Sequence, residues 1–414
     1  MTSKQRVVVI GGGMAAARLA RQLGSGDSQS DARYTVTVIG EEPHAPYNRV
    51  LLAEVLAGRY TPEVIALPAV PGALWLSGVR AVRVDRDVQL VHCDDGRAVP
   101  YDILVLATGS NPVLPPLRGL FAPGAHELPR GVHPFRTLDD CRALAGAEGR
   151  RAVVIGGGLL GVSAARALAE RGAQVVLAHQ GEHLMERQLD EEAGELLRAH
   201  LHDLGVEVHT ECRVRGLRTG DGAVRAVELA DGYALDADLV VLACGVRPRT
   251  GLAAAAGLTV RRGIVVDDAL RTDDPHIFAI GDCAEHDGVT YGLAGPALEQ
   301  ADLLAARLLD DAAGSYRGTR ALTRLTLGSP SPAAPVLDLA AFGETTPAPG
   351  DDVIRLSDAT RSAYRRVVVR GDRLVGGILL GDLGTVGALA RTWEGDEPLP
   401  AAPVLHLLTN DGGH

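Results

Sequence analysis

The first forty residues of the chain combine an apolar run, a cluster of glycines, a helix-favouring stretch and a second apolar run. The run 6–10 is rich in β-branched residues and leads into three glycines, Gly11 to Gly13, followed by the segment 14–23. A continuous apolar run of this length is typical of a buried parallel strand. The second run, 34–39, then completes a βαβ unit.

The same pattern recurs about 145 residues further along the chain. The run 151–155 precedes another three glycines, Gly156 to Gly158, and these are followed by the helix-favouring segment 159–170 and the apolar run 173–178. A duplicated βαβ unit predicts two domains that each bind a nucleotide at the carboxyl edge of a parallel sheet. The expected fold class is therefore α/β, with two Rossmann-like three-layer dinucleotide-binding domains.

The rest of the chain adds a proline-rich connection and a smaller C-terminal domain. Segment 111–131 carries five prolines, a density that disfavours helix and central strand and indicates an inter-domain connection. Segment 329–335 is rich in Pro, Ser and Ala, and the β-rich runs 365–369 and 374–380 flank a Gly-Asp turn that is typical of a hairpin. We expect residues 320–414 to form a small α/β C-terminal domain.

Composition and charge narrow the chemistry. The 414 residues carry a net charge of −11, which argues against a general nucleic-acid binder. Lys4 is the single lysine, so no lysine elsewhere can form a Schiff base or bind a phosphate. The sequence contains no apolar stretch of 18 residues and no signal-peptide pattern, which predicts a soluble, cytoplasmic protein without a membrane partner.

Cysteine and histidine spacing favours neither a disulfide framework nor a metal site. The five cysteines include no C-x-x-C pair, which predicts a reducing compartment and no redox dithiol. The histidines at 44, 200 and 202 have no metal-ligand context, so we expect no metal. Asp190 and the two glutamates after it are interpreted as the solvated first turn of a helix.

The first glycine cluster, Gly11-x-Gly13-x-x-Ala16, has the spacing of a dinucleotide fingerprint. The first glycine makes the turn, the second lets a pyrophosphate approach the backbone, and the third, small residue lets the helix pack on the strand. The pyrophosphate then lies at the helix N-terminus, where free N–H groups favour an anion. An acid after the second strand should bind the ribose hydroxyls, and Glu41 or Glu42 fits, although a polar insertion lengthens the usual spacing.

The second cluster, Gly156-x-Gly158-x-x-Gly161, is the full motif in the same context. Its second strand is followed by His179 and Gln180 instead of an acid. At this position there is no carboxylate to repel a 2′-phosphate and no arginine to bind one. The sequence therefore does not distinguish between NADH and NADPH as the cofactor. His179 is either a cofactor contact or a surface histidine.

Two further strand ends carry small residues and a polar side chain. One apolar run leads to Thr108 and Gly109, and another leads to Gly281 and Asp282. Ligands of doubly wound sheets bind at this edge. Asp282 can accept hydrogen bonds from ribityl or ribose hydroxyls, and a helix N-cap is the equally good alternative. Two dinucleotide sites in one chain indicate electron transfer from a nicotinamide to a flavin.

Taken together, these stretches resemble the flavoprotein family of pyridine nucleotide–disulfide oxidoreductases. The matches extend over about residues 5–310 in the family's order and read VVVIGGGMAAARLA, YDILVLATGSNP, AVVIGGGLLGVSAARAL, CGVRPRT, GIVVDD and IFAIGDCAEHDGVTYGLAGPALEQA. Segments 45–58, 183–190 and 364–382 look most like the FAD/NAD(P)H-binding portion of assimilatory nitrite reductase large subunits and the related rubredoxin and ferredoxin reductases.

The resemblance implies that the first fingerprint holds FAD, that the segment 291–296 passes near its isoalloxazine ring, and that the second fingerprint holds NAD(P)H. The residues so implied for FAD are Gly11, Gly13, Met14, Ala15, Ala16, Glu41, Arg49, Thr108, Gly109, Gly281, Asp282, Gly292 and Leu293. Those implied for NAD(P)H are Gly156, Gly158, Leu159, Leu160, Gly161, His179 and Gly245. No residue is assigned a catalytic role.

The family's topology also implies that the NAD domain is inserted in the FAD domain. We therefore expect a FAD-binding domain in two parts, 1–115 and 232–319, an NAD(P)H-binding domain at 116–231, and the C-terminal α/β domain at 320–414.

The chain departs from the family's pattern at three points. It has no cysteine between residues 1 and 92, where disulfide reductases carry a reactive cysteine or pair, so we expect no dithiol exchange. Ala53 and Glu54 stand where ferredoxin reductases often place a lysine near the flavin. Ser163 replaces the usual glutamate that helps to fix the nicotinamide. The iron–sulfur and sirohaem modules of a complete nitrite reductase are also missing, so we do not expect nitrite reduction by this chain alone.

The predicted function is therefore that of a FAD-dependent NAD(P)H oxidoreductase. Hydride passes from NAD(P)H to FAD, and electrons then pass to an external acceptor, either a ferredoxin- or rubredoxin-like protein or a nitrite reductase partner. The alternatives are a flavoenzyme that acts directly on a small molecule or O₂, and a flavin-binding protein whose redox state gates partner binding. The oligomeric state stays open, with a homodimer as one option.

A cluster of arginines in the C-terminal domain offers a docking face for an acidic acceptor. A solvated hairpin face is the favoured alternative. The arginines concerned are Arg361, Arg365, Arg366, Arg370 and Arg373.

Overall fold

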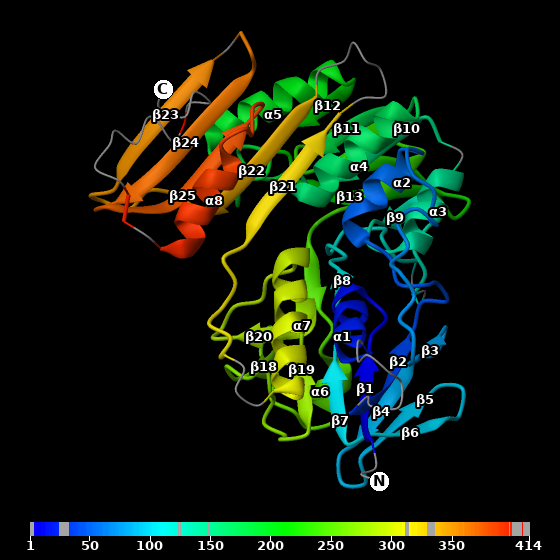
Figure 1. Ribbon diagram of the computed structural model, residues 1–414. Coiled ribbons are helices and arrows are strands. Elements are labelled where there is room, and N and C mark those ends of the chain that lie inside the picture. Colours follow the sequence, from blue (N-terminus) through cyan, green and yellow to red (C-terminus); the bar gives the residue numbers. More distant parts are fainter. Residues whose placement is uncertain are drawn as a thin grey trace. The chain divides into compact units, whose positions relative to one another are not determined.

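The computed structural model in Figure 1 describes most of the chain as two compact units. The described residues are 4–24, 33–122, 124, 126–147, 149–310, 314–328, 336–358, 360–396, 398–399 and 408. The polar insertion after Gly24 and the Pro/Ser/Ala-rich segment 329–335 lie outside them. The first unit comprises Met1–Leu51, Tyr60–Asn111 and Val246–Thr319, and the second comprises Leu52–Arg59, Pro112–Gly245 and Arg320–His414.

The first unit is built on a five-stranded parallel sheet in the order β19-β7-β1-β2-β3. The strands are β1 (Gln5–Ile10), β2 (Tyr34–Gly40), β3 (Ala73–Ser77), β7 (Ile103–Leu106) and β19 (Ile277–Ala279). Val7, Val8 and Val9 of the central strand are at most 1% exposed, which explains why its sequence is a continuous apolar run. Helices α1 (Met14–Gly24) and α7 (Ala294–Leu309) pack against each other beside this sheet (Figure 1).

Smaller elements complete the first unit. They are η1 (Arg49–Leu51), the antiparallel strands β4 (Ala81–Asp85), β5 (Leu90–Cys93) and β6 (Ala98–Pro100), β8 (Ser110–Pro112) at the unit's boundary, β17 (Val246–Pro248), α6 (Gly251–Ala255), the paired β18 (Ile264–Val266) and β20 (Ala284–His286), and η2 (Gly281–Cys283).

The second unit repeats the architecture with a five-stranded parallel sheet in the order β12-β11-β10-β16-β9. The strands are β9 (Val132–Pro134), β10 (Arg151–Ile155), β11 (Gln174–Ala178), β12 (Val206–His209) and β16 (Leu239–Leu242). The unit also contains the antiparallel strands β13 (Val214–Gly220), β14 (Ala223–Leu229) and β15 (Ala234–Asp236) and the helices α2 (Leu52–Leu56), α3 (Leu138–Gly146), α4 (Leu159–Glu170) and α5 (Glu191–Asp203).

The C-terminal part of the second unit is a five-stranded antiparallel sheet with one helix. Its order is β21-β22-β25-β24-β23. The elements are β21 (Leu322–Leu327), β22 (Leu337–Gly343), β23 (Asp352–Asp358), β24 (Ala363–Arg370), β25 (Arg373–Leu380) and α8 (Val386–Gly395). Gly371 makes the expected hairpin turn with a φ of +62°, and Trp393 of α8 packs on Phe342 with 5.1 Å between the ring centroids. The predicted α/β fold class, with two Rossmann-like parallel sheets and a small C-terminal domain, is confirmed.

The chain passes between the units at different points from those expected. The sequence placed the return to the first domain near residue 232, whereas β16 pairs with β10, so residues up to Gly245 belong to the second unit. The short helix α2 likewise packs on α3 and α4 of the second unit. Both differences arise because a short apolar run predicts a strand or helix but does not identify its distant partner.

Candidate functional site

The first glycine turn lies directly after β1 and requires glycine. Gly11 has a φ of +116°, and a Cβ on it would lie 2.1 Å from the carbonyl oxygen of Ala107. A Cβ on Gly13 would meet no atom within 4 Å, so the backbone is open to a ligand on that side. The helix then begins at Met14, and Ala15 and Ala16 are buried against the sheet. This arrangement fits the pyrophosphate of a dinucleotide, since the free N–H groups of the helix start face an open side.

The two acids that follow β2 have different partners. Glu41 is exposed at the strand end, and its Oε2 lies 2.8 Å from Nη2 of Arg249. Glu42 instead accepts hydrogen bonds from the hydroxyl of Tyr47, at 2.6 Å, and from the guanidinium of Arg49. Glu41 is therefore the acid that remains accessible for ribose hydroxyls, and Glu42 orients Arg49.

Arg49 stays charged in a half-buried position. Burial by itself lowers the pKa of Arg49, but Tyr47, Glu42 and Asp282 oppose this, and the pKa ends above its ordinary value. The Asp282 carboxylate, beside Gly281, is one of the charges that raise the pKa of Arg49.

The turns at Gly109 and Gly281 meet because β7 and β19 are neighbours in the sheet. Both glycines have positive φ, +71° and +77°, and a Cβ on Gly281 would lie 3.5 Å from the side chain of Ala15 in the first fingerprint. Asp282 lies inside η2 and accepts a hydrogen bond from Ser110 at 2.7 Å. The N-cap of η2 is Ile280, so the N-cap interpretation of Asp282 is wrong.

Thr108 and the residues before α7 complete this region. The Thr108 hydroxyl donates to the carbonyl oxygen of Arg249 at 2.7 Å. This hydrogen bond holds the turn at Thr108 against Arg249, whose side chain pairs with Glu41. Gly292 has a φ of +66°, and Leu293 is the N-cap residue of α7. The structure thus brings the residues implied for FAD to one edge of the first unit's sheet.

Gln300 is a residue that the sequence reasoning did not assign. It lies on α7, is 1% exposed, and accepts a hydrogen bond from the Gly281 N–H at 2.7 Å. Its amide donates to the hydroxyl of Tyr316 at 3.1 Å, and this hydroxyl lies 2.7 Å from that of Thr319. The available signal was a polar side chain among the buried positions of a largely apolar helix.

The second glycine turn has the same geometry after β10. Gly156 has a φ of +113°, and a Cβ on it would lie 2.4 Å from the carbonyl oxygen of Ala243. Gly158 faces open space and is the N-cap residue of α4, which starts with Leu159 and Leu160. A Cβ on Gly161 would lie 1.7 Å from the carbonyl oxygen of Gly156, so the third position of this fingerprint must be glycine. The turn fits a second pyrophosphate.

His179 and Ser163 both bond to the local backbone. Nδ1 of His179 accepts from the Gly157 N–H at 3.1 Å, so this half-buried ring supports the glycine turn and is not a free surface histidine. The Ser163 hydroxyl donates to the carbonyl oxygen of Leu159 at 2.8 Å, within its own helix. Gly245 follows β16 with a φ of +98°, and its carbonyl oxygen accepts from Val113 at 2.9 Å.

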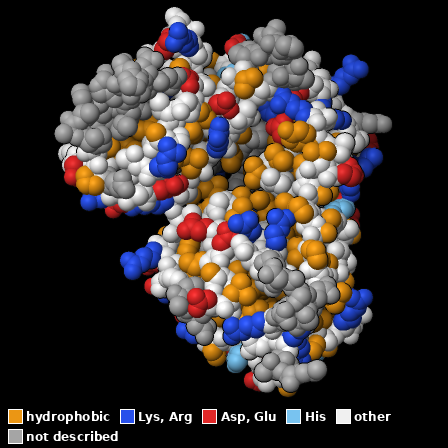
Figure 2. Space-filling view, viewed as in Figure 1, with side chains coloured by type: hydrophobic (Ala, Val, Ile, Leu, Met, Phe, Trp, Pro, Cys, Tyr) orange, Lys and Arg blue, Asp and Glu red, His pale blue; other side chains and the backbone are white. Residues whose placement is uncertain are grey.

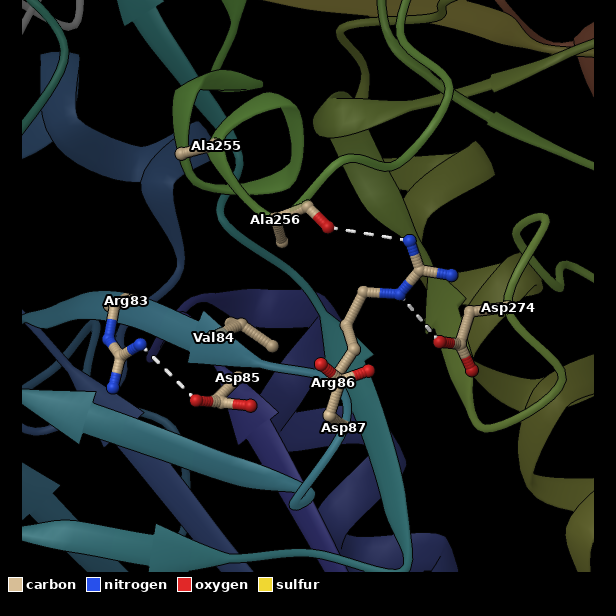
Figure 3. Close-up of a pocket in the computed structure, with 8 residues that line it drawn as sticks. All are labelled: Arg83, Val84, Asp85, Arg86, Asp87, Ala255, Ala256 and Asp274. Carbon is tan, nitrogen blue, oxygen red and sulfur yellow. Dashed lines mark hydrogen bonds and ion pairs between the residues drawn. The ribbon is translucent and has the colours of Figure 1, made fainter.

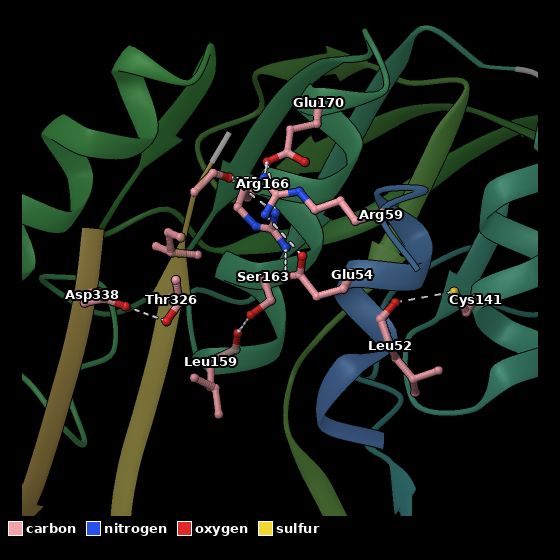
Figure 4. A network of polar contacts seen from close by, with 12 residues as sticks. Leu52, Glu54, Arg59, Cys141, Leu159, Ser163, Arg166, Glu170, Thr326 and Asp338 are labelled. Atoms are coloured by element: carbon pink, nitrogen blue, oxygen red, sulfur yellow. Dashed lines mark hydrogen bonds and ion pairs between the residues drawn. The ribbon is translucent and has the colours of Figure 1, made fainter. Parts of the chain in front are cut away.

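A network of four charged side chains, which the sequence did not predict, connects α2 to α4 (Figure 4). Arg166, 1% exposed, bonds Glu54 and lies 2.9 Å from Glu170. Arg59 lies 3.2 Å from Glu54 and 2.6 Å from Glu170, so each guanidinium bridges both carboxylates. Both arginines also donate to the carbonyl oxygen of Gly328, just after β21. From the sequence, Glu54 was of note only because it stands where ferredoxin reductases often have a lysine near the flavin.

The five arginines of the C-terminal domain all pair with acids within the second unit, so the docking face, which the sequence favours less than a solvated hairpin face, gains no support from them. Arg365 is buried and lies 2.6 Å from Asp382, and Arg366 lies 2.5 Å from Asp190. The remaining pairs are Arg361 with Asp358, Arg370 with Glu344 and Asp351, and Arg373 with Asp396. In Figure 2 the basic side chains of the visible face are interspersed with acidic ones.

Asp190 and the two glutamates after it do begin a helix, as the sequence predicted, but Asp190 itself is half-buried and not solvated. It is the N-cap of α5 and accepts from Ala193, but its other oxygen accepts from the Tyr364 hydroxyl at 2.5 Å. Burial and this carboxylate raise the pKa of Tyr364. The C-terminal sheet is therefore fixed to the N-terminus of α5.

The cysteines offer no reactive thiol. All five are free, and burial raises the pKa of each, to about 11 for Cys141 and Cys244. Thiols with raised pKa values are poor nucleophiles at neutral pH. Among the described residues, no three His, Cys, Asp or Glu side chains come together in a way that suits a metal ion. None of the described helices is long and apolar enough to cross a membrane.

A surface cavity of about 470 Å³ lies in the first unit, away from the fingerprints (Figure 3). It is lined by Arg83, Val84, Asp85, Arg86, Asp87, Ala255, Ala256 and Asp274. Four of its five charged side chains form ion pairs, with Arg86 2.7 Å from Asp274 and Arg83 3.2 Å from Asp85. It contains none of the residues implied for either cofactor.

The fold and the two glycine turns are typical of the class of proteins with two dinucleotide-binding sites, one on each parallel sheet. Comparison with known proteins agrees with this class. The chain belongs to the pyridine nucleotide-disulphide oxidoreductase family, whose sequence model matches residues 5–301. The rubredoxin NAD⁺ reductase C-terminal domain matches residues 336–392. Family membership identifies the cofactors as FAD and NAD(P)H.

The individual relatives include reductases of two kinds. A nitrite reductase [NAD(P)H] of Bacillus subtilis (strain 168) is 36% identical over 92% of this chain and 46% of its own length. A probable ferredoxin reductase of Castellaniella defragrans is 34% identical over 68% of each chain. The crystal structure of a ferredoxin reductase from Rhodopseudomonas palustris superposes with a TM-score of 0.83 at 26% identity and covers 96% of each chain. The chain thus spans about half the length of the first curated relative.

We expect Gln300→Leu to weaken FAD binding about tenfold, since the Gly281 N–H loses its buried acceptor. Fluorescence titration of the flavin-free protein with FAD measures the dissociation constant. Gln300→Glu keeps the acceptor oxygen and serves as the control, for which we expect a smaller loss. Equal FAD affinity in wild type and Gln300→Leu would show that Gln300 does not position this turn.

We expect Arg166→Met to lower the free energy of unfolding of the second unit by about 3 kcal/mol, because two carboxylates lose a buried partner. Urea unfolding followed by circular dichroism measures the change. Arg198→Met is the matched control, since Arg198 pairs with Glu195 at a half-exposed site and should contribute less than about 1 kcal/mol. Similar losses in both variants would contradict the structural role of the network.

Proposed function

We propose that the chain is a FAD-dependent NAD(P)H oxidoreductase that passes electrons to an external acceptor. The observation that carries this proposal is the presence of two glycine turns, at Gly11 and Gly156, each at the carboxyl end of the central strand of a separate parallel sheet. One site for FAD and one for a nicotinamide dinucleotide is the minimum that such a transfer requires.

We assign the first unit to FAD, and the parallel-sheet part of the second unit to NAD(P)H. Residues 320–414 form the C-terminal domain in this assignment. The proposed FAD contacts are Gly11, Gly13, Met14, Ala15, Ala16, Glu41, Arg49, Thr108, Gly109, Gly281, Asp282, Gly292 and Leu293. The proposed NAD(P)H contacts are Gly156, Gly158, Leu159, Leu160, Gly161, His179 and Gly245.

When bound, FAD supplies the two-electron chemistry, accepting a hydride from the nicotinamide and releasing electrons to the acceptor. The residues of the chain bind and orient. The helix starts at Met14 and Leu159 offer N–H groups to the two pyrophosphates, and Glu41 accepts hydrogen bonds from ribose hydroxyls. Arg49 presents a cation that Glu42 and Tyr47 hold in place. Hydride transfer needs no acid–base pair, so orientation is the main contribution of the protein.

We propose a protein acceptor, either a ferredoxin- or rubredoxin-like protein or a nitrite reductase partner. Support comes from the names of relatives, which include a probable ferredoxin reductase and a nitrite reductase. Disulfide exchange is disfavoured, because no cysteine occurs between residues 1 and 92 and burial raises the pKa of every thiol. The proposal is compatible with a homodimer and does not require one.

Anaerobic mixing of the purified flavoprotein with NADH and NADPH tests the proposal. We expect at least one dinucleotide to bleach the flavin absorbance within minutes, and an oxidised ferredoxin, rubredoxin or nitrite reductase subunit to restore it. Free FAD under the same conditions is the control. Failure of both dinucleotides to bleach the flavin would contradict an oxidoreductase. Recovery of the absorbance with O₂ but with no protein acceptor would instead favour a direct oxidase.

A further inference from the structure

The residue that follows the second strand of a dinucleotide-binding unit lies beside the 2′ position of the adenosine ribose. In the second unit this strand is β11, which ends at Ala178, and the next residue is His179. The ring of His179 is turned toward the glycine loop, because its Nδ1 accepts from the Gly157 N–H. The space that the strand-end acid occupies in other fingerprints is therefore not taken by the side chain of His179.

A carboxylate from the following loop reaches the same place. A Cβ added to Gly181 would lie 2.0 Å from Oε2 of Glu186, 2.7 Å from its Cδ and 2.8 Å from Nε2 of His179. Glu186 and His179 thus meet over Gly181, where any larger residue would displace them. The Glu186 side chain is exposed, so its carboxylate is accessible to a ligand.

An electrostatic effect supports this closeness. Burial lowers the pKa of His179, and the Glu186 carboxylate is the largest influence that opposes this shift. The ring and the carboxylate are therefore near enough to interact.

We propose that Glu186 makes the second site selective for NADH over NADPH. Its carboxylate takes the role of the missing strand-end acid, accepting hydrogen bonds from the 2′-hydroxyl of NADH and repelling the 2′-phosphate of NADPH. This inference rests on the proposed function, because it requires the second fingerprint to bind a nicotinamide dinucleotide.

The same loop contains one arginine, which would favour NADPH over NADH if it lay at the 2′ position. Arg187 follows Glu186 and is exposed, and an arginine at the 2′ position would bind the phosphate of NADPH. The atoms that a Cβ on Gly181 would meet first belong to Glu186 and His179, however, and not to Arg187. The geometry therefore favours repulsion of the phosphate.

Isothermal titration of the oxidised flavoprotein with NAD⁺ and NADP⁺ tests the proposal without turnover. We expect wild type to bind NAD⁺ at least about tenfold more tightly than NADP⁺, as like-charge contact predicts. Glu186→Gln should narrow this ratio, mainly through tighter NADP⁺ binding, and Glu186→Arg should reverse it. Glu182→Gln removes one carboxylate from the same loop and is the matched control, for which the ratio should not change.

Three results would overturn the assignment. Wild type could bind NADP⁺ as tightly as NAD⁺, Glu182→Gln could change the ratio as much as Glu186→Gln, or Arg187→Gln could weaken NADP⁺ binding in a wild type that prefers it. The first and third results contradict the selectivity, and the second contradicts its assignment to Glu186, while all three leave the proposed function intact. Binding of neither dinucleotide to any variant would contradict the proposed function as well.

Discussion

At the glycine turns that follow β1 and β10, the backbone passes so close to the end of a neighbouring strand that no side chain fits between them. Gly11 and Gly156 each lie where a Cβ would come within 2.1 Å and 2.4 Å of the carbonyl oxygens of Ala107 and Ala243. At both turns, the close approach lets the chain pass sharply from a strand into a helix whose first N–H groups remain free. The two proposed pyrophosphate sites, and with them the proposed assignment of FAD and NAD(P)H, depend on this steric constraint.

Around the first turn, the polar groups form a connected arrangement. Gln300 links the Gly281 turn to Tyr316, while Glu42 fixes Arg49 and leaves Glu41 accessible. The second unit uses buried charge instead. There Arg59 and Arg166 join α2, α4 and the segment after β21 through two carboxylates and one carbonyl oxygen. Such a network costs desolvation free energy, so its value lies in fixing one arrangement of these elements more than in added stability.

The sequence was sufficient for those features that depend on local pattern. The glycine spacing at 11–16 and 156–161, the buried strands beside it and the C-terminal hairpin around Gly371 were all predictable, since turn geometry and burial act directly on the residues concerned. The sheet to which 239–242 belongs, the partners of Arg366 and the role of Gln300 were not predictable. Each depends on contacts between residues far apart in the chain. The proposed place of Glu186 over Gly181 likewise emerged only once the loop was folded.

The central claim is that the first turn binds FAD and the second binds NAD(P)H, and Gly13 and Gly158 offer the most direct test of it. A Cβ on either residue meets no atom of the protein within 4 Å, so the side chain of a valine would begin in open space and would occupy the space of the proposed pyrophosphate. The measurement is the flavin absorbance of purified Gly13→Val and Gly158→Val before and after anaerobic addition of NADH or NADPH. We expect Gly13→Val to lack flavin, and Gly158→Val to retain flavin that neither dinucleotide bleaches. Full flavin content in Gly13→Val, or normal bleaching in Gly158→Val, would contradict the account.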